Sequence, residues 1–278
     1  MSKKLSIITI NLNNSTGLDK TMKSVLNQSF RDYEYFVIDG GSTDSSIEVI
    51  TGFEKLYRQK VKIIWLSEQD RGIYNAMNKG IDLATGEYLL FLNSGDTLVA
   101  PEILHTIFST SFSEDYVYGN LNLVRNEDIL YQDVKMSFDV PTLYNLYTEC
   151  LPHQASFIKR ELFEKYGKYD EDLKILGDWE FCIRTIIINN CSVRHIQFTI
   201  TNYDMGGISE TNGVKNKTEK NLILQRYFPH RIILDLEKLL YYRNDFKIID
   251  WYKDHRFYKF IMMFLYKAGN KIERVIRK

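Results

Sequence analysis

Polar side chains follow each of four predicted strands in the N-terminal half of the sequence. Carboxylate, amide and hydroxyl groups of this kind can hold a nucleotide, a diphosphate or a divalent cation. Because ligands of open α/β sheets bind outside the carboxyl ends of the strands, these side chains should meet at one edge of a sheet. In chain order they are Asn11, Asn13 and Asn14; Asp39, Ser42 and Asp44; Glu68, Asp70 and Arg71; and Asn93, Ser94 and Asp96.

Each cluster taken alone could be an ordinary turn or a helix cap, because Asn, Asp, Ser and Gly favour both. Four such clusters at one edge favour a binding site instead. No GxGxxG follows the first strand and the sequence contains no GxxxxGK[ST], which argues against a dinucleotide fingerprint and a P-loop. A sugar nucleotide is the remaining common ligand for a site of this kind.

Hydrophobic periodicity predicts the elements that would position these groups. Apolar runs predict strands at 5–12, 33–38, 61–66 and 87–92. Apolar residues at helical spacing predict helices at 18–26, 47–57 and 73–83, the second of them capped by Asp44. Strands and helices in strict alternation with short connections predict a doubly wound α/β sheet.

The pattern is looser after residue 96 and predicts the other side of a cleft. We expect a helix at 102–108, strands at 116–121 and 192–200, a helix opening at Asp178, and a polar loop at 203–217. Helical stretches at 218–228 and 231–242 follow. The predicted domains are therefore 1–215, with a nucleotide-binding half at 1–97 and an acceptor-binding half at 98–215, and a basic helical extension at 216–278.

Three runs carry a family resemblance: LSIITINLNN, SVLNQSFRDYEYFVIDGGSTDSS and SEQDRGIYNAMNKGIDLATGEYLLFLNSGD. They resemble the family-2 glycosyltransferases of the GT-A fold, particularly those that assemble bacterial surface polysaccharides, and the likeness returns at LGDWE, residues 176–180. The resemblance implies an α/β fold with a central, mostly parallel sheet flanked by helices. It also implies inverting transfer of a hexose or N-acetylhexosamine from a UDP-sugar to a hydroxyl of a growing, lipid-linked surface glycan.

The resemblance also implies roles for individual residues. Asn11, Asp39 and Asp70 would line the nucleoside pocket, and Asp178 would be the catalytic base. Asn93, Ser94 and Asp96 stand at the family's metal and diphosphate motif, where Asp96 would bind Mn²⁺ or Mg²⁺. That motif usually reads D-x-D-D, so Asn93 and Gly95 leave Asp96 as its only carboxylate. Gly40 likewise replaces a second aspartate that often contacts the base.

Three residues in the second half each have two interpretations. Asp178 could instead be the N-cap of its helix. Trp179 could be a core residue, or it could offer a flat face on which an acceptor sugar stacks. His153 could be a structural histidine, or it could reach the metal or the diphosphate.

Composition indicates which binding partners and which cellular location to expect. Basic and acidic residues number 36 each, which gives no global charge to favour nucleic acid as a partner. Three cysteines without a CxxC pair, no long apolar span and no cleavable leader favour a cytoplasmic protein.

Residues 256–278 hold seven Lys or Arg against one Glu, mixed with aromatic residues. This tail would either lie on an anionic membrane, placing the protein at its inner face, or pack as a terminal helix.

Two other functions stay open at this stage. A sugar-1-phosphate nucleotidyltransferase has a related sheet, but its Gly-rich loop bearing Arg and Lys is missing after the first strand. A noncatalytic glycan-binding protein could keep the same fold, and the presence of both Asp96 and Asp178 argues against it.

Overall fold

The computed structural model describes residues 3–125, 128–136, 138, 140–206, 213–242, 260–261, 263 and 265–267. The chain divides into two compact units, Met1–Ile223 and Leu224–Lys278. Helix α8 (Gly213–Tyr227) runs through both this division and the boundary at 215 that the sequence predicts.

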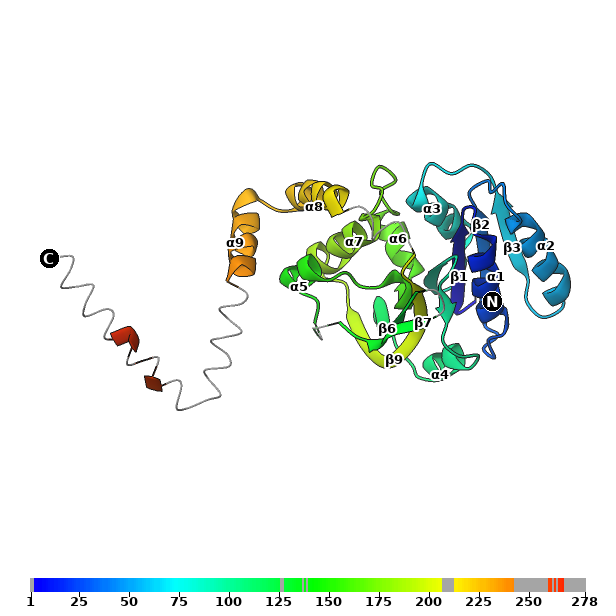
Figure 1. Ribbon diagram of the computed structural model, residues 1–278, viewed down its shortest axis with the longest axis horizontal. Helices are drawn as coiled ribbons and strands as arrows, with labels where there is room; N and C mark the ends of the chain where they lie inside the picture. Colours follow the sequence, from blue (N-terminus) through cyan, green and yellow to red (C-terminus); the bar gives the residue numbers. More distant parts are fainter. Residues whose placement is uncertain are drawn as a thin grey trace. The chain divides into compact units, whose positions relative to one another are not determined.

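The predicted alternation of strands and helices in the N-terminal half is confirmed (Figure 1). Strands β1, β2, β3 and β4 form a parallel sheet in the order β3-β2-β1-β4. Each observed boundary lies within about three residues of the predicted one. The elements are β1 (Leu5–Asn11), α1 (Ser15–Leu26), β2 (Tyr33–Asp39), α2 (Ser46–Tyr57), β3 (Ile63–Ser67), α3 (Ile73–Leu83) and β4 (Tyr88–Asn93).

Helices cover both faces of this parallel sheet. All seven residues of β1 are buried, and alternate side chains point to opposite faces. Ile7 belongs to a core cluster with Leu18 and Met22 of α1. Ile8 faces α3, where its Cγ2 lies 2.4 Å from the position that a Cβ on Gly80 would take. The continuous apolar run of β1 therefore reflects burial on two sides.

The second half continues the same sheet with mixed strand directions. Strand β8 is antiparallel to both β4 and β6, β9 is parallel to β6, and β5 and β7 pair antiparallel with β9 and β6. The prediction of a mostly parallel sheet thus holds best in the first half. The elements are β5 (Thr97–Leu98), α4 (Ile103–Phe108), β6 (Tyr116–Arg125), β7 (Asp128–Val134), α5 (Leu143–Thr148), η1 (His153–Ala155), β8 (Ser156–Lys159), α6 (Arg160–Tyr166), α7 (Gly177–Cys182), the π-helical turn η2 (Ile183–Ile188) and β9 (Val193–Asp204).

The polar loop predicted at 203–217 is shorter than expected. Strand β9 continues through Asp204 because it pairs with β6 up to Val124, and α8 already begins at Gly213. Residues 207–212 lie outside the described part of the chain.

The C-terminal unit contains helix α9 (His230–Tyr241). Most of the predicted basic tail, including 256–259 and 268–278, lies outside the described residues. Among the helices that the structure describes, none has the length and apolar character needed to cross a bilayer.

Candidate active site

The ends of β1, β2 and β4 are joined by a network of short hydrogen bonds. The Asn11 Nδ2 group donates to Asp39 Oδ1 at 2.7 Å and lies 2.9 Å from Ser46 Oγ. The Ser94 hydroxyl donates to Asn11 Oδ1 at 2.7 Å. The structure therefore brings together Asn11, Asp39 and Ser94, as the strand-end argument predicts.

Asp39 organises the loop that follows β2. Its carboxylate accepts hydrogen bonds from the Ser42 backbone N–H at 2.9 Å, the Ser42 hydroxyl at 2.6 Å and the Ser67 hydroxyl at 2.7 Å. Burial disfavours the charged form, but these bonds together with the one from Asn11 outweigh it, so the pKa of Asp39 is lowered. The side chain is fully buried. A nucleoside base that binds Asp39 would have to take over one of these bonds, and its predicted role stays a prediction.

Asp70 lies beside the same loop and is neutralised by Lys79. Lys79 Nζ forms a close ion pair with Asp70 and a second one with Glu68 at 2.8 Å. Asp70 Oδ2 lies 2.9 Å from the position that a Cβ on Gly40 would occupy. A second aspartate at position 40 would therefore require the Asp70 side chain to shift, because Asp70 already lies next to this position.

The loop after β4 carries a second group of polar atoms. Asp96 is 2% exposed. Its Oδ2 accepts from the Asn93 backbone N–H at 3.2 Å, and its Oδ1 accepts from the Asp204 backbone N–H at 3.0 Å. Burial, with a smaller contribution from the charge of Asp204, raises the pKa of Asp96 to about 7, although the two backbone hydrogen bonds and His153 act in the opposite direction. The end of β9 therefore meets the end of β4 at this point.

Sequence reasoning missed Asp204 because it ended the preceding strand at residue 200. The strand in fact runs to Asp204, and the same strand-end argument that found Asp96 would then have found this carboxylate as well.

The residues at this point suit a divalent cation by the chemistry of their donors. Asp96 and Asp204 offer carboxylate oxygens, and the buried Asn93 Oδ1 has no hydrogen-bond partner among the described residues. Oxygen donors are what Mg²⁺ and Mn²⁺ prefer. No three His, Cys, Asp or Glu side chains within the described ranges are placed to hold a metal ion together, so the protein itself would supply few ligands.

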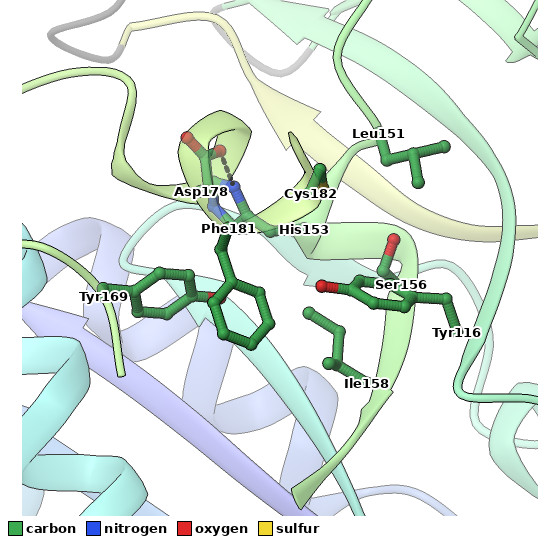
Figure 2. Close-up of a pocket in the computed structure, with 9 residues that line it drawn as sticks. All are labelled: Tyr116, Leu151, His153, Ser156, Ile158, Tyr169, Asp178, Phe181 and Cys182. Carbon is green, nitrogen blue, oxygen red and sulfur yellow. Dashed lines mark hydrogen bonds and ion pairs between the residues drawn. The ribbon is translucent and has the colours of Figure 1, made fainter. Parts of the chain in front are cut away.

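Asp178 and His153 form a pair in the second half of the chain (Figure 2). His153 Nδ1 lies 2.9 Å from Asp178 Oδ2, and the two side chains are 15% and 18% exposed. The Tyr74 hydroxyl lies 3.0 Å from Asp178 Oδ1, which also accepts from the Trp179 backbone N–H at 2.9 Å. Asp178 and His153 line a cavity of about 10 Å³, room for about one water molecule.

The partners of Asp178 decide its charge. Burial disfavours the ionised form, but the hydrogen bond and charge of His153, with the bonds from Tyr74 and Trp179, hold the pKa of Asp178 below its usual value. An ionised carboxylate only accepts hydrogen bonds, so the hydrogen between the pair belongs to His153 Nδ1. Asp178 is not the N-cap of α7, since Leu176 occupies that position. At neutral pH the chain thus presents an ionised and fixed carboxylate.

His153 connects this carboxylate to the loop after β4. Its second ring nitrogen, Nε2, lies 3.3 Å from Asn93 Nδ2. Both ring nitrogens therefore face protein groups, and His153 would have to give up one of these contacts to bind a metal. The predicted metal role of His153 stays a prediction, whereas its contact with Asp178 is direct.

A comparison with known protein families identifies the family of the chain. Residues 6–173 match the family described as glycosyl transferase family 2. The chain belongs to that family. The PGL/p-HBAD biosynthesis glycosyltransferase of Mycobacterium bovis is 32% identical over 210 residues, which are 74% of this chain and 79% of that relative.

Solved structures of low identity share the fold of this family-2 glycosyltransferase. One is S. aureus TarS 1-349 in complex with UDP-GlcNAc, with a TM-score of 0.61 and 20% identity over 75% of this chain and 61% of that one. Another is the mannosyltransferase PcManGT from Pyrobaculum calidifontis in complex with GDP-Man and Mn²⁺, with a TM-score of 0.54 and 15% identity over 72% of this chain and 55% of that one. The chain spans less than two thirds of either solved chain, and these likenesses show the GT-A fold alone.

The prediction that Trp179 offers an open face to an acceptor sugar is wrong for this glycosyltransferase. The Trp179 ring is 2% exposed, and its Nε1–H donates to the Leu146 carbonyl at 2.5 Å. Lys220 Nζ lies 5.3 Å from the ring centroid. Trp179 is therefore a core residue that anchors α7, which is the other interpretation that the sequence left open.

Proposed function

We propose that this glycosyltransferase moves a hexose or N-acetylhexosamine from a UDP-sugar to a hydroxyl of a growing surface glycan, with inversion at the anomeric carbon. The observation that carries the proposal is the position of the Asp178 carboxylate, which three protein groups hold while part of its side chain stays exposed. Such a carboxylate can take a proton from an attacking hydroxyl.

The proposed reaction is one displacement. The acceptor O–H gives its proton to Asp178, and the oxygen forms a bond to C1 of the sugar while the bond from C1 to the diphosphate oxygen breaks. UDP leaves with the electron pair of that bond. Because attack comes from the face opposite the leaving group, the anomeric configuration inverts. His153 keeps its Nδ1 hydrogen throughout and orients the carboxylate.

The donor would lie over the strand ends of the N-terminal half. Asn11, Asp39 and Asp70 would face the nucleoside, and Asn93 and Ser94 the diphosphate. The UDP-GlcNAc complex of TarS supports a uridine donor on this fold. The GDP-Man complex of PcManGT shows that the fold also accepts guanosine, so the base must be tested on the chain itself.

A divalent cation, Mn²⁺ or Mg²⁺, would offset the negative charge of the departing diphosphate. Asp96 and Asp204 would hold it from the ends of β4 and β9. Mn²⁺ in the PcManGT complex supports this part of the proposal.

A donor panel tests the proposal. The protein is incubated in Mn²⁺ with UDP-GlcNAc, UDP-glucose, UDP-galactose and GDP-mannose, and release of nucleoside diphosphate is followed with water as the acceptor. We expect one UDP-sugar to be hydrolysed at least tenfold faster than GDP-mannose. Faster hydrolysis of GDP-mannose would exclude a uridine donor, and no release from any donor together with no UDP binding in calorimetry would exclude the activity.

We further propose that the basic tail brings the enzyme to the inner face of a cell membrane, in the cytoplasm. The large apolar side chains that the structure describes there, Phe260, Ile261, Met263, Leu265 and Tyr266, are between 37% and 73% exposed. The net charge of +6 over residues 256–278 suits anionic lipids, at roughly 1 kcal/mol for each basic residue near the surface. Cys150, Cys182 and Cys191 are all free thiols, as a reducing compartment requires.

Sedimentation with vesicles tests the tail. Vesicles containing phosphatidylglycerol should bind the full chain at low salt, release it at high salt, and bind a chain that ends at His255 more weakly. Equal sedimentation of the two chains would show that the tail is not the membrane contact.

A further inference from the structure

One carboxylate of α8 holds the backbone that leads to Asp178. The Lys174 N–H donates to Glu219 Oε1 at 2.8 Å, and the N–H groups of Ile175 and Leu176 donate to Glu219 Oε2 at 3.0 and 2.9 Å. Three successive backbone N–H groups thus converge on one side chain from 43 to 45 residues further along the chain. Hydrogen bonds to an ionised acceptor are about twice as strong as bonds between neutral groups.

The carbonyl side of the same segment is held by Tyr74. Its hydroxyl oxygen lies 2.6 Å from the Ile175 carbonyl oxygen and 3.0 Å from Asp178 Oδ1, so its single hydrogen is shared between these two acceptors. The Tyr74 ring packs against Gly177, where a Cβ would come within 2.7 Å of the ring. The chain from 174 to 178 is therefore fixed by Glu219 through its N–H groups and by Tyr74 through a carbonyl.

The residue next to Glu219 holds the other flank of Asp178. Lys220 Nζ donates to the Tyr147 carbonyl at 2.6 Å and lies 4.2 Å from the Tyr147 ring centroid. The same ammonium group lies 5.3 Å from the ring centroid of Trp179. Consecutive residues of α8 thus contact the segment before Asp178 and the residue directly after it.

We infer that Glu219 is a positioning residue for transfer, which fixes the place of Asp178 through the backbone of residues 174–176. The inference rests on the proposed role of Asp178 as the base. A carboxylate that must meet an acceptor hydroxyl within hydrogen-bond reach tolerates little displacement, since a shift of about 1 Å can cost 100-fold in rate. Glu219 itself touches no reacting atom.

The substitution Glu219→Gln tests this role. An amide keeps the size of the side chain, but its NH₂ group cannot accept from the segment 174–176, so at least one backbone N–H loses its partner. We expect kcat for UDP release from the best UDP-sugar of the panel to fall by roughly 10- to 100-fold. The KM for that donor and the Kd for UDP should stay within about twofold, because the nucleotide site is built from other elements.

A second variant and a matched control separate positioning from folding. Glu219→Asp keeps the charge on a shorter side chain and should lose less activity than Glu219→Gln, even if the amide variant unfolds. Glu161→Gln removes a carboxylate that is 65% exposed and lies 3.6 Å from Lys159 Nζ, and should leave kcat unchanged. A Glu219→Gln protein that is folded and has wild-type kcat would overturn the inference. A fall in UDP affinity that matches the fall in kcat would do the same.

A double-mutant cycle tests whether Glu219 acts through Asp178. In an Asp178→Asn background the further change Glu219→Gln should alter the residual rate by less than about twofold, because the group that it positions is already inactive. If Glu219→Gln lowered the rate by the same factor in the Asp178→Asn background as in wild type, Glu219 would act on a group other than Asp178. If Asp178→Asn alone retained activity, the proposed base would fail, whereas a silent Glu219→Gln beside an inactive Asp178→Asn would refute only the positioning role.

Discussion

The two halves of the catalytic unit differ in how their polar groups are satisfied. At the strand ends of the first half, Asn11, Asp39 and Ser94 bond chiefly to one another and to their own loops. In the second half, Asp178 is held by His153 of the same half and by Tyr74 of α3 in the first half. The first half is a closed frame suited to hold a ligand in one place. The second half keeps a partly exposed charge whose position depends on distant elements.

The largest expected effect is that of removing the carboxylate of Asp178 in the second half. Asp178→Asn should lower the rate of UDP release by about 100- to 10,000-fold, because the amide cannot take a proton. UDP affinity measured by calorimetry should stay close to that of wild type. Asp172→Asn, an exposed aspartate six residues earlier, is the matched control. Transfer within threefold of wild type would remove Asp178 from the mechanism.

The next prediction concerns the point where the two halves meet, at Asp96 and Asp204. EDTA should lower UDP release by about 100-fold or more, since a bound cation supplies several kcal/mol of charge stabilisation, and Mn²⁺ should restore it. Asp204→Asn should raise the Mn²⁺ concentration needed for half the maximal rate, whereas the exposed Asp128→Asn should not. Full turnover in EDTA would exclude the metal. The departing diphosphate would then depend on cationic side chains, and Arg71 and Lys79 would first have to leave their ion pairs with Glu171 and Asp70.

His153→Ala would show how far the second half depends on a single partner. Without the imidazole, burial is opposed only by the bonds from Tyr74 and Trp179, so the pKa of Asp178 should rise. The base is active when ionised, so the acidic limb of the profile of kcat/KM against pH should move to higher pH. The rate at pH 7 should fall roughly tenfold. His105→Ala on the exposed side of α4 is the control, and an unchanged acidic limb would contradict the orienting role.

The last prediction concerns stability rather than rate, at Asp39 in the first half. Asp39→Asn places an NH₂ group among the N–H and O–H groups of Ser42 and Ser67, which should lower the free energy of unfolding by about 1–3 kcal/mol at pH 7. The native pKa of Asp39 lies below its unfolded value of about 3.9. Its contribution is therefore complete above pH 4 and is lost as the pH falls through the native pKa.

Urea titrations between pH 7 and pH 2 would measure this contribution. The difference in stability between wild type and Asp39→Asn should shrink below pH 4. The exposed Asp32→Asn, which loses a surface ion pair with Lys3 at 3.8 Å, should be close to wild type throughout. A difference that does not depend on pH would mean that the charge of Asp39 adds no stability.

The two halves also differ in how well their helices and strands could be predicted from the sequence. Strands β1 to β4 and helices α1 to α3 are long apolar runs or stripes bounded by turn residues, so local patterns place them well. Strand β7 was missed because six of its seven residues are exposed, and β8 because it has only four residues. Neither provides a pattern long enough to recognise.

The site follows the same division. Asp39, Ser94 and Asp96 could be found because a local rule places strand ends at one edge. Tyr74 and Glu219 could not, since their roles come from contacts with residues 104 and 43 positions away along the chain. The burial of Trp179 likewise depends on Leu146 and Lys220 from other helices.

Gly95 stands at a position where the family motif has an aspartate, and its conformation explains why glycine fits there. Gly95 has a φ of +114°, which L side chains rarely adopt, and a Cβ there would lie 2.9 Å from Asp204 Oδ2. The space next to position 95 of the motif is thus filled by a carboxylate from β9. An aspartate at position 95 would require the Asp204 side chain to move. A carboxylate that is missing from this motif along the chain is therefore supplied to the same loop by β9, and the spelling of D-x-D-D alone does not count the acidic groups that lie there.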